Sequence, residues 1–365
     1  MNLCINVTMA IYYRRMMLNV SRLVGRHIKL NNNLKTNIPI VSYGLSVNNF
    51  KFQYLYESSN RSYNNNNKND NTTCYYFLLS SLFGFFNFKE EDGEEISELI
   101  ITIKRSILSI QRNEFKKAEQ LLHVALRQAQ ALQNQNAITY IYDLMANLAL
   151  ETKQLKKAET LFLLVLERLL SNGVTENDLK VIHISLKLAN IYEQTGDMEK
   201  AETGYKYCLE NVQIYVDNNP KDENVLILLA MTYDWYAQML FSQARYTDAF
   251  KYFEQSYNIC VKVNGREHEQ TVNLLNYLGT VSYKMEEYDK AIEYLTTATE
   301  IGRSLPDMIH IASVHINLGN VYLKKGLYLN AKKACYEGQR IAKNKEDEES
   351  LVEANKCLDD IKKLL

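Results

Sequence analysis

One pattern of large, small and aromatic residues returns along most of this chain and limits what it can fold into. In its clearest copy, Leu318-Gly319-Asn320-Val321-Tyr322 is followed by Gly326 and then by Tyr328 and Ala331. A small residue beside a large one lets two helices approach closely, and glycine readily ends a helix. This copy therefore predicts two helices joined by a tight turn.

The alanine at the end of the pattern locates the other copies. The six anchor alanines are Ala118, Ala158, Ala201, Ala249, Ala291 and Ala331, at spacings of 40, 43, 48, 42 and 40 residues. A small residue stands twelve positions before each anchor: Ser106, Ala146, Ala189, Ala237, Gly279 and Gly319. Helix hairpins with such a period stack and bury a continuous core. We therefore expect an all-α fold, a right-handed α-solenoid of about six extended hairpins of 40–48 residues, over residues 96–345.

The last segment, residues 346–365, has apolar residues at helical spacing. These are Leu351, Val352, Ala354, Leu358, Ile361 and Leu365. The end of a solenoid needs a cover for its exposed apolar face. We predict that this segment is a capping helix on the sixth hairpin.

The first 56 residues differ from the rest in charge. They hold seven basic residues and no acid, whereas residues 57–365 hold 35 basic and 43 acidic residues, a net charge of −8. An acid-free, arginine-bearing start is typical of a mitochondrial transit region, and a disordered basic tail is the alternative. The mildly acidic remainder argues against nucleic acid as a partner.

Two further segments precede the repeats. Residues 57–73 are rich in asparagine and predict a disordered linker. Residues 74–88 form a run of 15 residues without charge and with many aromatic side chains. A membrane-spanning helix usually needs ~20 residues, so the run is short for a span. It predicts either a membrane anchor or a hydrophobic lead-in that packs on the first helix.

The sequence holds no motif for catalysis or cofactor binding. It lacks a glycine-rich phosphate loop and the signatures of zinc peptidases, serine hydrolases and kinases. The six cysteines form no CxxC pair, and we interpret them as free thiols, mostly buried. We interpret Trp235 and most tyrosines as core residues at helix packing positions. We expect no enzyme activity, no metal and no cofactor.

The strongest candidate for a functional surface is a row of polar residues. In hairpin repeats of this kind, the residue after the small position of the first helix faces the concave groove. Those residues are Asn147, Asn190, Gln238, Thr280 and Asn320. A carboxamide donates and accepts hydrogen bonds together, so the row could hold an extended peptide by its backbone. The alternative is that these are solvated polar residues on an open groove.

A second set stands three positions before the small residue. It consists of Asp143, Asp234 and Asn276. We expect these residues on the same wall of the groove. The two acids there could favour basic ligands or repel carboxylate-terminated ones.

Several runs resemble known families. The hairpin pattern is typical of tetratricopeptide repeats. Gly265-Arg266-Glu267-His268 is similar to the inter-repeat signature of kinesin light chains, with Glu269 where a proline is usual. Three longer runs, together with the basic leader, resemble the mitochondrial tetratricopeptide repeat protein 19 family: Ala137–Ala149, Ile184–Tyr192 and Ala201–Cys208.

The resemblance to the tetratricopeptide repeat protein 19 family implies a function that the residues alone do not. It implies a non-enzymatic protein of the mitochondrial inner membrane that binds respiratory complex III, with the Rieske iron–sulfur protein among its partners. It also implies a role in assembly or maintenance of that complex, including turnover of Rieske fragments. One alternative is a cytosolic adaptor of the kinesin light-chain type, against which the acid-free leader argues. The other is a peptidase, which would need a nucleophile or metal motif.

Overall fold

The computed structural model describes residues 94–305, 308 and 310–364, all of which lie in one compact unit, Asn71–Leu365. The predicted transit region (1–56), linker (57–73) and apolar run (74–88) lie outside the described residues. Every regular element of the described part is an α-helix.

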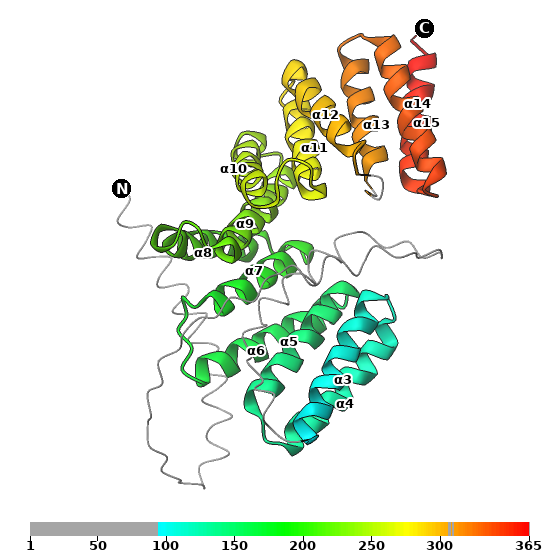
Figure 1. Cartoon of the computed structure of the whole chain (residues 1–365). Helices are drawn as coiled ribbons and strands as arrows, with labels where there is room; N and C mark the ends of the chain where they lie inside the picture. The colour runs from blue at the N-terminus through cyan, green and yellow to red at the C-terminus, as the bar shows by residue number, and fades with distance from the viewer. Residues whose placement is uncertain (1–93, 306–307, 309, 365) are drawn as a thin grey trace. The chain divides into compact units, whose positions relative to one another are not determined.

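Thirteen helices are described, of which the first twelve pair into six hairpins (Figure 1). We call the first helix of a hairpin its A helix and the second its B helix. The pairs are α3 (Glu94–Gln111) with α4 (Phe115–Ala131), α5 (Gln135–Glu151) with α6 (Leu155–Ser171), α7 (Leu179–Gln194) with α8 (Met198–Asn218), α9 (Glu223–Ser242) with α10 (Tyr246–Asn264), α11 (Glu269–Lys284) with α12 (Tyr288–Gly302), and α13 (Ile311–Lys324) with α14 (Tyr328–Asn344).

Each B helix packs on the A helix of the next hairpin, so the hairpins stack in chain order. The thirteenth helix, α15 (Glu348–Lys362), packs against α14 and α13. These contacts confirm the predicted fold class, an α-solenoid of six hairpins with a capping helix at its C-terminal end.

The turn inside each hairpin is the same in all six. Each has three residues, and the middle one lies in the left-handed region: Asn113, Lys153, Gly196, Ala244, Glu286 and Gly326, with φ between 57° and 85°. The N–H of the third turn residue donates to the carbonyl five residues earlier, as in Glu114 to Ser109 at 2.8 Å. This bond is the helix-ending Schellman pattern, which needs one left-handed residue. Glycine fills that position in only two of the six turns.

The predicted small residues lie at the contact between the two helices in the third, fifth and sixth hairpins, at Ala189, Gly279 and Gly319. All six anchor alanines are fully buried. At Gly279, an added Cβ would lie 2.5 Å from Cγ of buried Leu295 on the B helix. Only a small residue therefore allows the two helices of this hairpin to pack at this distance.

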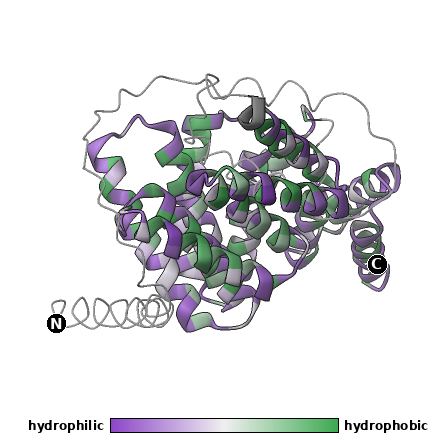
Figure 2. Ribbon diagram, turned by 90° about the horizontal axis from the view of Figure 1, so that it is seen from below, coloured by the Kyte–Doolittle hydropathy of each residue, from purple (hydrophilic) through white to green (hydrophobic). Residues whose placement is uncertain are grey.

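The A helices in the middle of the stack are buried on most sides. Figure 2 shows hydrophobic and hydrophilic residues distributed around individual helices, with both kinds on the outer ones.

Among the described residues, α9 is the one helix long and apolar enough to cross a membrane, but 72% of its apolar window is buried inside the protein. Trp235 on α9 is buried, as the sequence predicts. We therefore assign α9 to the core.

The interpretation of all cysteines as free thiols is wrong for one pair. Cys335 on α14 and Cys357 on α15 form a disulfide, with their Cα atoms 6.3 Å apart. The two residues are 22 positions apart in the sequence, and the packing of α15 on α14 brings them together. Cys208 and Cys260 are buried free thiols, as predicted.

Candidate functional site

The structure divides the predicted carboxamide row into a buried member and accessible ones. Asn147 on α5 is only 5% exposed. Four residues are half-buried and retain surface for a ligand: Asn190 on α7, Gln238 on α9, Thr280 on α11 and Asn320 on α13. They occupy the same position on four successive A helices, where the hairpin pattern places them.

Asn147 is part of a buried network between α5 and α7. Its Oδ1 accepts a hydrogen bond from Nζ of Lys187 at 2.6 Å, and its Nδ2 donates to the Asp143 carbonyl at 2.7 Å. The ammonium of Lys187 also lies 4.0 Å from Oδ1 of Asp143 and 5.3 Å from the centre of the Phe162 ring. Lys187 and Asp143 have no exposed side-chain surface. The expectation that Asn147 and Asp143 line an open groove is therefore corrected, because Lys187 fills the space beside them.

Burial controls the titration of this network. It raises the pKa of Asp143 above its usual value, and the nearby Lys187 opposes that shift. It lowers the pKa of Lys187, and Asp143 opposes that shift in turn. The neighbouring His183 has its pKa lowered first by burial and then by the charge of Lys187. A single added or lost charge would consequently disturb all three groups.

Asp234 occupies the same position on α9 as Asp143 on α5 and is also buried. Its carboxylate accepts hydrogen bonds from Nε2 of Gln238 at 3.0 Å and from Nε2 of Gln270 at 3.1 Å. Burial raises the pKa of Asp234 to about 6, and the two amide donors oppose the shift. The expected role of Asp234 in selecting ligands is corrected in the same way, because its partners lie within the protein.

Asn276 on α11 occupies the same repeat position as Asp143 and Asp234, but it is half-buried and keeps some exposed surface. Its Oδ1 accepts from Nδ2 of Asn317 on α13 at 2.9 Å. Each polar residue three positions before the small residue thus meets the A helix of the following hairpin. Asp234 accepts a hydrogen bond from Gln270 and Asn276 accepts one from Asn317, whereas Asp143 forms an ion pair with Lys187 at 4.0 Å without a hydrogen bond. These residues tie neighbouring A helices together, and only Asn276 keeps exposed surface.

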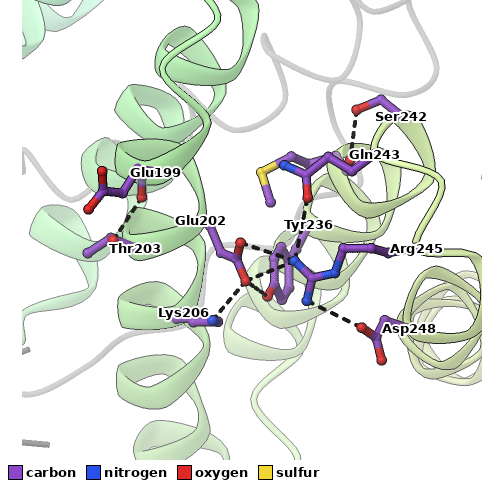
Figure 3. Close-up of polar contacts among 10 residues, drawn as sticks. Glu199, Glu202, Thr203, Lys206, Tyr236, Ser242, Gln243, Arg245 and Asp248 are labelled. Carbon is purple, nitrogen blue, oxygen red and sulfur yellow. Dashed lines mark hydrogen bonds and ion pairs between the residues drawn. The ribbon is translucent and has the colours of Figure 1, made fainter. Parts of the chain in front are cut away.

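A polar cluster that the sequence reasoning missed lies on the B-helix side. Glu202 on α8 accepts hydrogen bonds from Nη1 of Arg245 at 3.1 Å and from the Tyr236 hydroxyl at 3.1 Å, and it pairs with Lys206 at 2.8 Å (Figure 3). Burial alone would raise the pKa of Glu202, but the bonds from Lys206 and Arg245 outweigh it and hold the pKa below its usual value. The cluster fastens the third hairpin to the fourth.

A sequence signal for this cluster exists in hindsight. The dipeptide Ala-Glu occurs at the anchor of the first three hairpins, giving Glu119, Glu159 and Glu202. Each of these carboxylates meets the following hairpin: Glu119 pairs with Lys157, Glu159 lies beside Tyr192, and Glu202 binds Arg245. Both members of the first pair line a surface cleft of about 880 Å³, together with Phe115, Met145 and Leu148.

Among the described residues, no group of three or more His, Cys, Asp or Glu side chains could hold a metal ion. What the A-helix face presents is uncharged hydrogen-bonding groups held at regular intervals. Such a surface can bind a polypeptide segment.

The six stacked hairpins and their A-helix face define a tetratricopeptide repeat protein. The tetratricopeptide repeat family matches the sequence over residues 228–304 and also over 182–210 and 312–345.

Similar proteins of known family identify the branch of tetratricopeptide repeat proteins to which this chain belongs. A tetratricopeptide repeat protein 19 homologue of Drosophila melanogaster is 39% identical over 285 residues, which cover 78% of this chain and 77% of the relative. The Homo sapiens protein of that name is 33% identical over 287 residues, which cover 75% of each chain. This chain therefore belongs to the mitochondrial tetratricopeptide repeat protein 19 family, as the runs in its second and third hairpins predict.

Solved structures support the fold alone. The apo form of RapI has a TM-score of 0.58 at 15% identity, covering 78% of this chain and 75% of that one. A Rap protein in complex with competence and sporulation factor has a TM-score of 0.52 at 15% identity, covering 84% and 89%. Both are similar to this chain in the stacking of helix hairpins.

Proposed function

We propose that this chain is a non-enzymatic interaction protein of the mitochondrial inner membrane. In this role it binds respiratory complex III and supports assembly or maintenance of the complex, including turnover of fragments of the Rieske iron–sulfur protein. Membership of the tetratricopeptide repeat protein 19 family carries the proposal. The fold agrees with it, because stacked helix hairpins provide extended surfaces for binding other proteins.

We propose the accessible part of the carboxamide row as the surface that binds a partner segment. This surface consists of Asn190, Gln238, Thr280 and Asn320, with Asn276 beside them. None of these side chains carries a charge, and each can hydrogen-bond to a peptide group. An extended segment of a partner would be held mainly by its backbone, which tolerates many side chains. Such tolerance suits a protein that handles fragments.

Two matched double variants test this surface. Asn190→Ala with Asn320→Ala should weaken the binding of Rieske-derived peptides, since each bond left unmade costs about 1–3 kcal/mol. The control is Gln120→Ala with Asn258→Ala, which removes two exposed carboxamides from the B helices α4 and α10. Calorimetric titration of the full chain would measure both. Equal affinities for the two variants would contradict the assignment.

A further inference from the structure

The outer face of α14 carries a stripe of basic and apolar residues. Six exposed side chains form it, and we call them the α14 stripe: Leu329, Lys332, Lys333, Tyr336, Arg340 and Lys343. At about 3.6 residues per turn, all six fall within roughly a third of the helix circumference. The only acid of α14 is Glu337, which pairs with Arg340 at 2.6 Å.

The other B helices near this end have a different charge pattern. The preceding B helix, α12, exposes Asp289, Lys290, Glu293 and Glu300. The one before it, α10, exposes acids and lysines in equal number, as Asp248, Lys251, Glu254 and Lys262. Among the last three hairpins, the positive stripe is therefore a feature of the sixth, and it occurs in a region, residues 57–365, whose net charge is −8.

Most of the positive charges in the stripe are not neutralised by an acidic side chain of the described residues. Within the described part of the chain, no ion pair involves Lys332, Lys333 or Lys343, and the Lys332 ammonium lies 6.0 Å from the centre of the Tyr336 ring. Leu329 is 79% exposed, more than any other large hydrophobic side chain described, and Tyr336 is 47% exposed. Exposed leucine and tyrosine among lysines leave apolar surface in water that a partner could cover.

We propose that the α14 stripe binds the surface of an anionic phospholipid membrane. Lysine and arginine attract anionic headgroups, while tyrosine and leucine favour the boundary between headgroups and acyl chains. All six side chains are exposed on one side of a helix, so the stripe suits a flat partner better than an extended peptide. The opposite face of α14 is held in the protein by buried Ala331 and by the disulfide of Cys335. The helix can therefore meet a membrane without unfolding.

Vesicle sedimentation of the full chain tests the proposal. The probes are phosphatidylcholine vesicles with and without phosphatidylglycerol. Wild-type protein should bind the anionic vesicles more tightly, and salt should weaken that added binding. The variant Lys332→Glu, Lys333→Glu, Lys343→Glu should lose at least about tenfold of the affinity for anionic vesicles. Its binding to neutral vesicles should not change, which separates the stripe from the segment at 74–88.

A control variant matches the charge change. Lys156→Glu, Lys251→Glu, Lys262→Glu reverses three exposed lysines on α6 and α10 and should bind like wild type. Leu329→Ser with Tyr336→Ser should also weaken binding to anionic vesicles if the side chains enter the headgroup layer. Equal loss in both lysine variants would overturn the proposal. A second combination of results would also overturn it: soluble polyglutamate displaces the protein from the vesicles, and the Leu329 and Tyr336 changes have no effect on binding. An acidic protein segment would then be the better partner.

Discussion

Lys187 is a charged side chain with no exposed surface, held between α5 and α7 by Asn147 and Asp143. A buried ion pair need not stabilise a protein more than apolar residues of the same size would, because both charges lose their water. Removing only one partner is different, since it leaves an uncompensated charge or an unmade hydrogen bond. This network therefore fixes how the second and third hairpins stack.

Lys187→Met should lower the free energy of unfolding by about 3–5 kcal/mol, because Asp143 and Asn147 lose their buried partner. Urea unfolding at neutral pH would measure the change. The double variant Lys187→Met with Asp143→Leu should recover much of the loss. Lys156→Met, at an exposed position on α6, should have little effect. A loss from Lys187→Met no larger than that of the control would contradict this account.

Asp234 gives a prediction for pH. Its pKa is about 6 in the folded chain, and an unfolded aspartate titrates near ~3.9. The folded state thus holds the proton more firmly, and the stability that this group contributes falls as the pH rises from about 4 to about 6. The two pKa values imply a total loss of about 3 kcal/mol.

Asp234→Asn removes the titration and keeps the shape of the side chain. As the pH rises from about 4 to about 6, the free energy of unfolding of the variant should increase relative to that of wild type. At pH 7 the variant should be the more stable protein. Denaturant unfolding of both proteins at several pH values would show the difference. A difference that stays constant from pH 4 to pH 7 would mean that Asp234 does not titrate in this range.

The residue scale also shows where sequence reasoning stops. Repeat position alone placed Asn147 and Asn190 together, yet one is buried and the other is accessible. The difference comes from Lys187, a residue of the next hairpin that reaches back to α5. Hydrogen bonds between hairpins depend on side-chain reach across the stack, which no single repeat reveals. Periodicity therefore predicts which residues share a helix face but not which partners they find there.

At the scale of elements, the hairpin boundaries could be predicted closely. The B helices begin at Phe115, Leu155, Met198, Tyr246, Tyr288 and Tyr328, each three residues before its anchor alanine. The turn residues could not be predicted as well, because four of the six left-handed positions hold residues other than glycine. Packing of the two helices fixes the turn, so these residues adopt a conformation that they seldom favour alone.

The capping helix α15 depends on a small cluster of buried residues. Ala331 and Cys335 of α14 meet Cys357, Leu358 and Ile361 of α15, and the disulfide joins the two sides. Deleting residues 346–365 should lower the midpoint of thermal unfolding, because the apolar face of the sixth hairpin becomes exposed. Unchanged unfolding after the deletion would contradict the role of α15 as a cap.

The disulfide can be tested apart from the packing. Cys357→Ser should cost about 2–4 kcal/mol, the usual contribution of a disulfide, while α15 stays in place. A reducing agent should lower the midpoint of thermal unfolding of wild type and leave that of Cys357→Ser unchanged. A wild-type protein that does not respond to reduction would argue against the disulfide as a stabilising link.

At the scale of the whole molecule, the six hairpins and the capping helix present two surfaces that we propose for binding. Their A-helix face offers accessible carboxamides, and the outer face of α14 offers positive charge beside exposed Leu329 and Tyr336. The carboxamides lie on A helices, whereas the α14 stripe lies on a B helix. A partner segment and a membrane therefore need not compete for the same surface. Membership of the tetratricopeptide repeat protein 19 family suggests which partner to seek first.

Affinity purification of the tagged full chain from mitochondria tests the central claim most directly. Mass spectrometry of the co-purified proteins should identify complex III subunits, including the Rieske protein or its fragments. The variant Asn190→Ala with Asn320→Ala should recover fewer Rieske fragments than the control Gln120→Ala with Asn258→Ala. Recovery of no complex III subunit with the wild-type chain would contradict the proposed function.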